Sequence, residues 1–255
     1  MIGVIFCGWG ILDLVQRSLA PWVELRHQGG CKICAVSVRF AGFEGEDDGT
    51  RSYLREMKEM GDIDYLIDSP DSIPEVVARG MALTYLKGQG VDAVIQFDSD
   101  EVTDTESIHR MLAFVDANPF TQWFRFSYAN LVFDSKTYLA DPFTPPRLHR
   151  IKAPDGYTAH SFSADNDICY GHHILRNLKP QEQYPSQVIP WSIFKPLHYS
   201  WLGDTPERAA RSKAKIRYQL EGRKWPQCQF SWDDSQGGLI FNPALPRPKV
   251  VREST

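Results

Sequence analysis

The residues best suited to chemistry are two carboxylates, Asp98 and Asp100, at the end of the apolar run 93–97. Such a run is typical of a buried strand. Side chains alternate along a strand, so both carboxylates point the same way if the extended conformation continues. Paired carboxylates can hold a hard divalent cation, which can bridge phosphate oxygens. The segment therefore predicts a metal site for a phosphate-bearing ligand; a solvated acidic turn before the next helix is the alternative without chemistry.

Two other acidic motifs share features with the same segment. An EF-hand loop beginning at Asp98 is excluded, because Val102 and Thr103 occupy the positions of an oxygen ligand and of the required glycine. A phosphohydrolase of the haloacid dehalogenase type would use Asp98 as its nucleophile and Asp100 as acid and base. Residues 98–102 resemble the first motif of that family. However, that motif normally lies on the first strand, and the later acidic metal motif is missing here.

The segments that must position these carboxylates alternate between strand and helix through the first 120 residues. Apolar runs predict strands at residues 3–7, 32–40, 65–67 and 91–97, and helical spacing predicts helices at residues 11–25, 51–60 and 74–87. Pro21 is expected to kink or shorten the first helix. Thr103 and Glu106 fit a capping box for a fourth helix, which Asn118-Pro119 ends. This alternation predicts an α/β fold with a mostly parallel central sheet flanked by helices, and ligands bind outside the carboxyl ends of such strands.

The sequence changes in character after residue 120, where aromatic residues and prolines become frequent. This composition predicts a lobe of irregular strands and ligand-binding loops. A further helix is predicted at residues 205–221, and an irregular tail follows Gly237. We expect one domain in three parts, which are residues 1–101, 102–204 and 205–255.

Several segments, taken in order, resemble glycosyltransferases of family 2, of the bacterial or viral type, which have the GT-A fold. Residues 75–83 and 90–101 resemble the family's helix, glycine, strand and Asp-x-Asp, with Gly80 where Asn is usual. Residues 123–150, which include Tyr138-Leu139 and Pro145-Pro146-Arg147, are similar to the family's aromatic segment. His198-Tyr199-Ser200-Trp201 resembles its late His-Tyr-x-Trp motif.

Two segments that hold the nucleotide in the family differ in this chain. The first strand ends in Cys7-Gly8-Trp9-Gly10, where a Tyr-Asn-Glu-like sequence is usual. The Asp-Asp-Gly-Ser that follows the second strand is present only as a displaced Asp47-Asp48-Gly49-Thr50. A non-catalytic protein that binds a nucleotide sugar is therefore an alternative to a transferase, beside the phosphohydrolase.

The resemblance implies a nucleotide-sugar donor, most often a UDP-sugar, and an inverting transfer of a hexose to an acceptor hydroxyl. A Mn²⁺ or Mg²⁺ ion would neutralise the diphosphate leaving group. Metal-ligand roles carry over to Asp98, Asp100 and His198, and nucleotide contacts carry over to Asp98, Asp100, Arg79 and Asp48. Arg79 also has a plainer interpretation as the partner of Glu75 one helical turn away, and His198 as an ordinary histidine.

An inverting transfer needs a base that deprotonates the acceptor hydroxyl, and the family usually supplies a carboxylate after the Asp-x-Asp. The nearest suitable residues are Asp165 and Asp167, although their segment is also typical of a turn. His160, His172 and His173 surround them and could form a metal cluster. The run Gly171-His172-His173-Ile174 is more typical of a strand, in which adjacent side chains face opposite ways.

The acceptor is not identified by the sequence, and a glycan, a lipid-linked acceptor and a modified base in phage DNA are the candidates. An enzyme acting on a DNA base must first expose it. The predicted helix at 205–221 carries cations that either form a solvated face or contact a polyanion, namely Arg208, Arg211, Lys213, Lys215 and Arg217.

Composition excludes several other classes of protein. The chain has 255 residues, a formal charge of −4 and 12% aromatic residues, which is typical of a globular protein. No apolar run approaches the ~20 residues that cross a bilayer. Five cysteines and no recognisable signal peptide predict a reducing compartment, the cytoplasm of a bacterium or of a virus-infected cell. Cys31 and Cys34 form a CxxC for which packing is favoured over zinc or redox chemistry.

Overall fold

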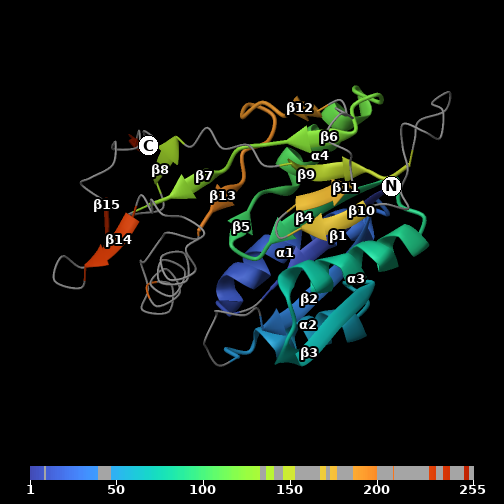
Figure 1. The fold of residues 1–255 in the computed structure, drawn as a ribbon, viewed down its shortest axis with the longest axis horizontal. Helices are drawn as coiled ribbons and strands as arrows, with labels where there is room; N and C mark the ends of the chain where they lie inside the picture. The colour runs from blue at the N-terminus through green and yellow to red at the C-terminus, as the bar shows by residue number, and fades with distance from the viewer. Residues whose placement is uncertain are drawn as a thin grey trace.

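The computed structural model describes residues 1–8, 10–39, 47–132, 136–140, 146–152, 167–170, 173–176, 186–199, 209, 230–233, 238–241 and 250–252. Within these residues, a seven-stranded sheet lies at the centre and four helices pack on it (Figure 1). The helices are α1 (Leu12–His27), α2 (Thr50–Glu59), α3 (Glu75–Gly88) and α4 (Thr105–Asp116).

The strand order of the large sheet is β12-β6-β9-β4-β1-β2-β3. Neighbours are parallel except at β9, which runs antiparallel to both β4 and β6. The predicted α/β fold class, with a mostly parallel central sheet flanked by helices, is thus confirmed. The strands are β1 (Ile2–Cys7), β2 (Cys31–Arg39), β3 (Tyr65–Ser72), β4 (Ala93–Asp98), β6 (Trp123–Arg125), β9 (Pro146–Arg150) and β12 (Ser186–Val188).

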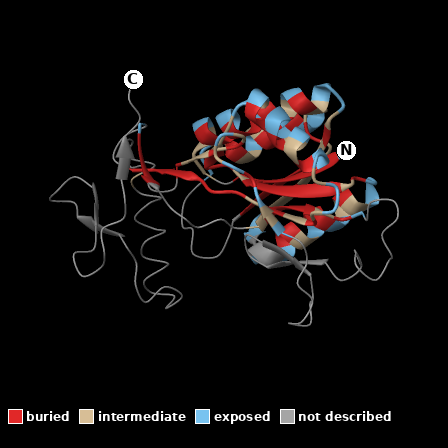
Figure 2. Ribbon diagram, turned by 90° about the horizontal axis from the view of Figure 1, so that it is seen from above, coloured by how far each residue is buried: buried red, intermediate tan, exposed pale blue. Residues whose placement is uncertain are grey.

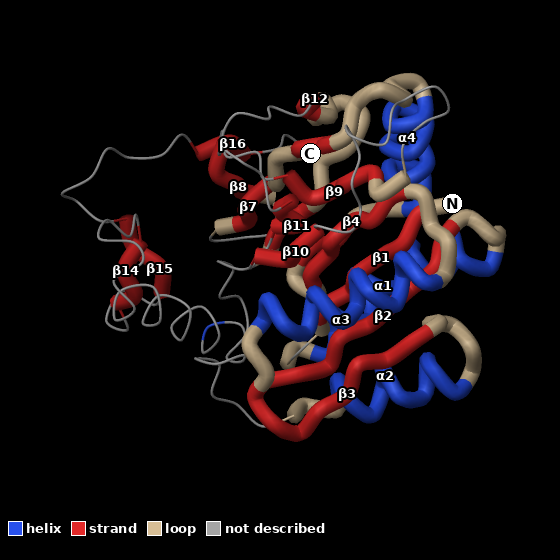
Figure 3. The backbone as a smooth tube through the Cα atoms, turned by 45° about the vertical axis from the view of Figure 1, so that its right-hand side comes forward, coloured by secondary structure: helices blue, strands red, loops and turns tan. Residues whose placement is uncertain are grey.

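Short strands dominate the described residues after residue 120, as their composition predicts. Five of them form a second sheet in the order β16-β8-β7-β13-β5, and two further pairs form hairpins, of which β14 with β15 lies away from the large sheet (Figure 3). The second sheet contains β5 (Glu101–Val102), β7 (Ala129–Leu131), β8 (Thr137–Ala140), β13 (Leu197–His198) and β16 (Val250–Arg252); the hairpins are β10 (Asp167–Tyr170) with β11 (His173–Arg176), and β14 (Phe230–Asp233) with β15 (Gly238–Phe241). Of the predicted strand at residues 171–174, His173 and Ile174 lie in β11, which pairs antiparallel with β10; Gly171 and His172 lie outside the described residues.

The core lies on both faces of β1, because successive side chains of a strand point to opposite faces. Val4 and Phe6 pack with residues of α1, α2 and α4, whereas Ile5 and Cys7 pack with residues of α3. The buried strands form a layer between helices whose outer faces are exposed (Figure 2). This packing holds β1 and β4 in register, so that Cys7 lies opposite Asp98 at their carboxyl ends.

Three local expectations were wrong. Pro21 does not shorten α1, which continues to His27. Strand β3 extends beyond the predicted residues 65–67 and through Pro70, which an edge strand tolerates because no partner needs the missing N–H. The cap of α4 is Asp104, not Thr103. The Asp104 carboxylate accepts a hydrogen bond of 2.7 Å from the Ser107 amide, so the helix begins one residue later than a capping box at Thr103 requires.

The two CxxC cysteines are buried free thiols on opposite sides of β2. Burial raises the pKa of both Cys31 and Cys34 to about 12. Thiols on opposite faces of a sheet cannot share a zinc ion, and thiols so hard to ionise are poor redox nucleophiles. The predicted packing role is therefore confirmed. Among the described residues, no helix is both long enough and apolar enough to traverse a bilayer.

Asp64 is expected to make stability sensitive to acid. Its carboxylate accepts hydrogen bonds from Arg26 (3.0 Å), Lys32 (3.1 Å) and the Ile33 amide (2.9 Å). Burial by itself raises the pKa of Asp64, but these donors outweigh it and lower that pKa below its usual value. A carboxyl with a lowered folded pKa stabilises the fold above its unfolded pKa, near 3.9, and this contribution is lost as pH falls further. In urea titrations between pH 6 and 3, Asp64→Asn should flatten the acid dependence of the unfolding free energy; an unchanged slope would contradict this.

Candidate active site

The acidic motif forms a turn between two strands. Strand β4 ends at Asp98, Ser99 and Asp100 form the turn, and β5 begins at Glu101. The Ser99 amide donates to the Cys7 carbonyl (2.8 Å), and the Tyr199 amide donates to the Asp100 carbonyl (2.8 Å). Because the chain turns after Asp98, the extended conformation that would align Asp98 with Asp100 does not continue.

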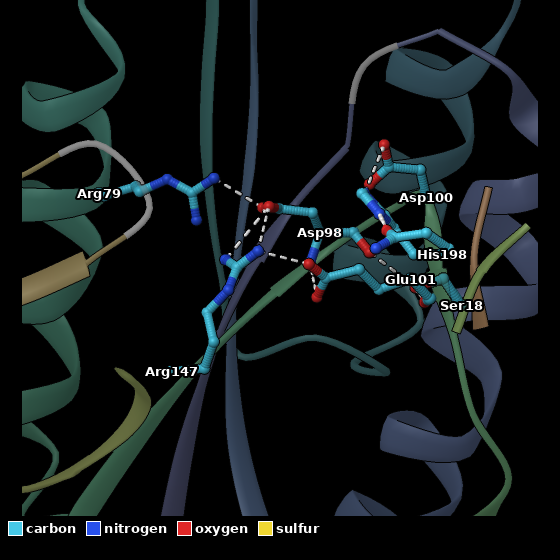
Figure 4. A network of polar contacts seen from close by, with 8 residues as sticks. Ser18, Arg79, Asp98, Asp100, Glu101, Arg147 and His198 are labelled. Atoms are coloured by element: carbon cyan, nitrogen blue, oxygen red, sulfur yellow. Dashed lines mark hydrogen bonds and ion pairs between the residues drawn. The ribbon is translucent and has the colours of Figure 1, made fainter. Parts of the chain in front are cut away.

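Asp98 lies between two buried arginines (Figure 4). Arg79 on α3 donates to Oδ1 of Asp98 at 2.6 Å, and both terminal nitrogens of Arg147 on β9 approach Oδ2 at 3.2 and 3.3 Å. The side chains of Arg79 and Arg147 are only 1% and 6% exposed. Two guanidinium groups fix the Asp98 carboxylate in one orientation.

Arg147 also contacts a second carboxylate of the same turn. Its Nη2 donates to Oε1 of the fully buried Glu101 at 2.5 Å, and Oε2 of Glu101 accepts from the Asp98 amide at 3.1 Å. Burial raises the pKa of Glu101, while the Arg147 charge opposes that rise. The same two carboxylates raise the pKa of Arg147 despite its burial. The resulting network joins two guanidinium groups and two carboxyl groups.

Asp100, Glu101 and His198 form the only group of ligand atoms in the described part of the chain that lie close enough to hold a metal ion. One atom from each lies within 4.8 Å of the others. Nε2 of His198 lies 3.6 Å from Oδ2 of Asp100, and Nδ1 contacts Oδ1 of Asn130. A proton on Nδ1, donated to Asn130, leaves the Nε2 lone pair facing Asp100. Carboxylate oxygens with one imidazole suit Mn²⁺ or Mg²⁺ better than a soft metal, so the residues fit the implied ion.

The remaining site residues from the sequence are placed as follows. Asp48 accepts hydrogen bonds from the Leu12 amide (2.6 Å) and the Thr50 amide (3.2 Å), so it joins the start of α1 to the start of α2. Asp167 begins β10, and its side chain lies outside the described residues, as does Asp165. The basic segment with Arg208, Arg211, Lys213, Lys215 and Arg217 also lies outside them.

Four residues of the site were not singled out from the sequence, namely Ser18, Glu101, Asn130 and Arg147. Glu101 directly follows the Asp-x-Asp, and Arg147 belongs to the segment that resembles family 2, so both carried a signal. Ser18 lies inside α1, and its hydroxyl approaches the carbonyl oxygens of Asp98 (3.1 Å) and Glu101 (2.5 Å). Nothing in the sequence indicates these contacts, because Ser18 is separated from Asp98 by 80 positions and from Glu101 by 83 positions.

Comparisons with known proteins give a likeness of fold. No family model matches the sequence, and no curated protein matches it. S. aureus TarS is similar at 13% identity and a TM-score of 0.42, and the match covers 58% of this chain and 28% of TarS. Its fragment 1–349 is similar at 13% identity and a TM-score of 0.43, and that match covers 58% of this chain and 46% of the fragment. This chain therefore spans less than half the length of either TarS structure.

Glucosyl-3-phosphoglycerate synthase from Mycobacterium tuberculosis, solved with Mn²⁺, UDP and phosphoglyceric acid, is similar at 10% identity and a TM-score of 0.44. The match covers 98% of this chain and 89% of that protein. These similarities are distant in both identity and TM-score, and the functional proposal rests on the site itself.

Proposed function

We propose that this protein is a metal-dependent glycosyltransferase that moves a sugar from a nucleotide sugar, assigned here as a UDP-sugar, to an acceptor hydroxyl with inversion. The observation that carries the proposal is the convergence of Asp100, Glu101 and His198 at the carboxyl end of β4. Ligands of parallel α/β sheets bind at that edge, and a divalent ion there can bridge the phosphates of a nucleoside diphosphate.

Within this proposal, Asp100 and His198 hold the ion directly. Both carboxylate oxygens of Asp98 already accept hydrogen bonds from arginines, so Asp98 is assigned to orienting the turn and to the nucleotide. When bound, the ion neutralises the charge that develops on the leaving diphosphate. Asp48 lies beside the start of α1, directly after the β1 loop, and is assigned to the nucleotide.

The acceptor base remains assigned to Asp165 or Asp167 from the sequence alone. The basic segment from Arg208 to Arg217 is proposed to contact an anionic part of the acceptor or donor. A phosphohydrolase is less well supported, because a nucleophilic Asp98 would have to attack while both its oxygens are held by guanidinium groups.

A thermal-shift panel tests the proposal. Wild-type protein is heated with UDP, GDP, dTDP and their sugars, each with Mn²⁺ or with EDTA. A ligand at about 100 times its dissociation constant adds about 2.7 kcal/mol of stability, so one nucleotide should raise Tm clearly and only with the metal. Phosphate release from a simple phosphomonoester without nucleotide stabilisation would favour the phosphohydrolase; a shift without transfer to any acceptor glycan would favour the non-catalytic binding protein.

A further inference from the structure

The turn 98–101 is held at both of its ends by the same residue. Arg147 contacts the carboxylate of Asp98, the last residue of β4, and the carboxylate of Glu101, the first residue of β5 (Figure 4). These two carboxylates flank Asp100. A rigid guanidinium fork that binds both ends therefore fixes the width of the turn that presents Asp100.

Ser18 holds the same turn through its backbone. The Ser18 hydroxyl on α1 lies 3.1 Å from the carbonyl oxygen of Asp98 and 2.5 Å from that of Glu101. It is fully buried, so water does not compete for these bonds. Arg147 thus joins the side chains at the two ends of the turn, and the two carbonyls there share the single proton of the Ser18 hydroxyl.

The opposite wall of the site is tied to the same group. The Arg147 guanidinium carbon lies 5.4 Å from the centre of the Tyr128 ring, and that ring lies 5.3 Å from the His198 ring. The Tyr199 amide, next to His198, donates to the Asp100 carbonyl at 2.8 Å. Displacement of Arg147 would therefore alter both sides of the gap between Asp100 and His198.

We infer that Arg147 and Ser18 are positioning residues, which clamp the turn 98–101 so that Asp100 faces His198 at a separation that one divalent ion can bridge. Neither residue touches the ion or the substrate in this assignment. Arg147 acts on the site through Asp98 and Glu101, and Ser18 acts through their carbonyl groups. The inference about geometry is independent of the proposed function; its consequence for metal binding rests on that function.

The test uses Arg147→Met and Arg147→Lys, with Ser18→Ala as a smaller change. Lysine keeps the positive charge, but its single ammonium group lacks the planar, forked arrangement of donors with which a guanidinium group binds two carboxylates at once. Arg150→Lys is the matched control. Arg150 lies on the same strand and is half-buried, but its guanidinium donates to the carbonyls of Val115 and Thr121, away from the turn.

The first measurement is residue-resolved amide hydrogen exchange by NMR on the full chain without metal. Exchange at the Ser99 and Tyr199 amides should become at least about tenfold faster in Arg147→Met, relative to amides of β2. Arg147→Lys should lie between Arg147→Met and wild type, and Arg150→Lys should match wild type. A general loss of stability would accelerate β2 equally, and that result, or an unchanged ratio in a folded variant, overturns the inference. If Arg147→Met does not fold, the same ratio is read from Arg147→Lys and Ser18→Ala.

The second measurement is calorimetric titration of the same proteins with Mn²⁺ in the presence of UDP. Affinity should fall about tenfold or more in Arg147→Met and stay unchanged in Arg150→Lys. If the wild-type protein binds no Mn²⁺ in the presence of UDP, the proposed function fails, while the exchange data still test the clamp. If exchange rises locally but Mn²⁺ affinity does not change, the clamp exists and the claim that it sets the metal site is wrong.

Discussion

Asp100→Asn is expected to abolish the metal-dependent stabilisation by nucleotide while leaving the fold intact. Asparagine has nearly the same shape, but it removes the negative charge that faces Nε2 of His198 at 3.6 Å. Mutation of a residue that only supports a metal ligand lowers metal affinity about 10- to 100-fold, so loss of a direct ligand should lower it about a hundredfold or more. A nucleotide–metal pair that adds about 2.7 kcal/mol to wild type should then add about 0.4 kcal/mol to the variant.

The measurement is the unfolding free energy with and without UDP and Mn²⁺, by urea titration or thermal shift. Asp116→Asn, an exposed carboxylate at the end of α4, is the matched control and should keep the full effect. Sugar transfer should be lost together with the stabilisation. If Asp100→Asn retains the metal-dependent stabilisation, the ion is bound elsewhere and the assignment of Asp100 is wrong.

Arg79→Met is expected to destabilise the fold by about 3 kcal/mol, because it removes one partner from a buried ion pair. The Arg79 side chain is 1% exposed and lies 2.6 Å from Asp98, which is 14% exposed. Asp98 retains Arg147, so the cost should lie at the lower end of the range for a broken buried pair. The double variant Arg79→Met with Asp98→Asn should be less destabilised than the sum of the two single variants, because it leaves no carboxylate short of a partner.

Denaturant titration of the two single variants and the double variant measures this coupling. Arg55→Met is the control. Arg55 is 51% exposed and pairs with Asp68, and such surface pairs contribute only about 0–1 kcal/mol. Additive effects at Arg79 and Asp98 would show that the pair is not energetically coupled. An Arg79→Met effect as small as that of Arg55→Met would show that water reaches the network.

The order and type of the main elements could be predicted from the sequence. The apolar runs of β1, β2 and β4 and the helical spacing of α1 to α4 are local properties of the chain, and burial on both faces makes the pattern strong. The place of Asp98 and Asp100 at the carboxyl end of β4 follows from the same local pattern. The resemblance to family 2 added His198, which the structure brings to Asp100.

Boundaries set by competition between neighbours were predicted less well. Thr103 and Glu106 have the right spacing for a capping box, but Asp104 is a better acceptor for the Ser107 amide and starts the helix one residue later. Pro70 ends a strand only where its missing N–H is needed, and β3 lies at the edge of the sheet. The start of α4 and the end of β3 therefore depend on which groups lie next to these residues in the folded protein.

The roles of the charged residues were decided by the tertiary structure. Arg147 lies 46 positions from Glu101 and 49 from Asp98, and Arg79 lies 19 positions from Asp98, so no local pattern shows that they meet. Their contacts turn Asp98 into the centre of a buried ion network and leave Asp100 to face His198. The sequence by itself determined which strand carries the acidic motif, because periodicity is encoded residue by residue. Only the folded sheet determined which carboxylate is held by arginines and which faces His198, because that depends on which side chains the packing of β9, α3 and β13 brings alongside.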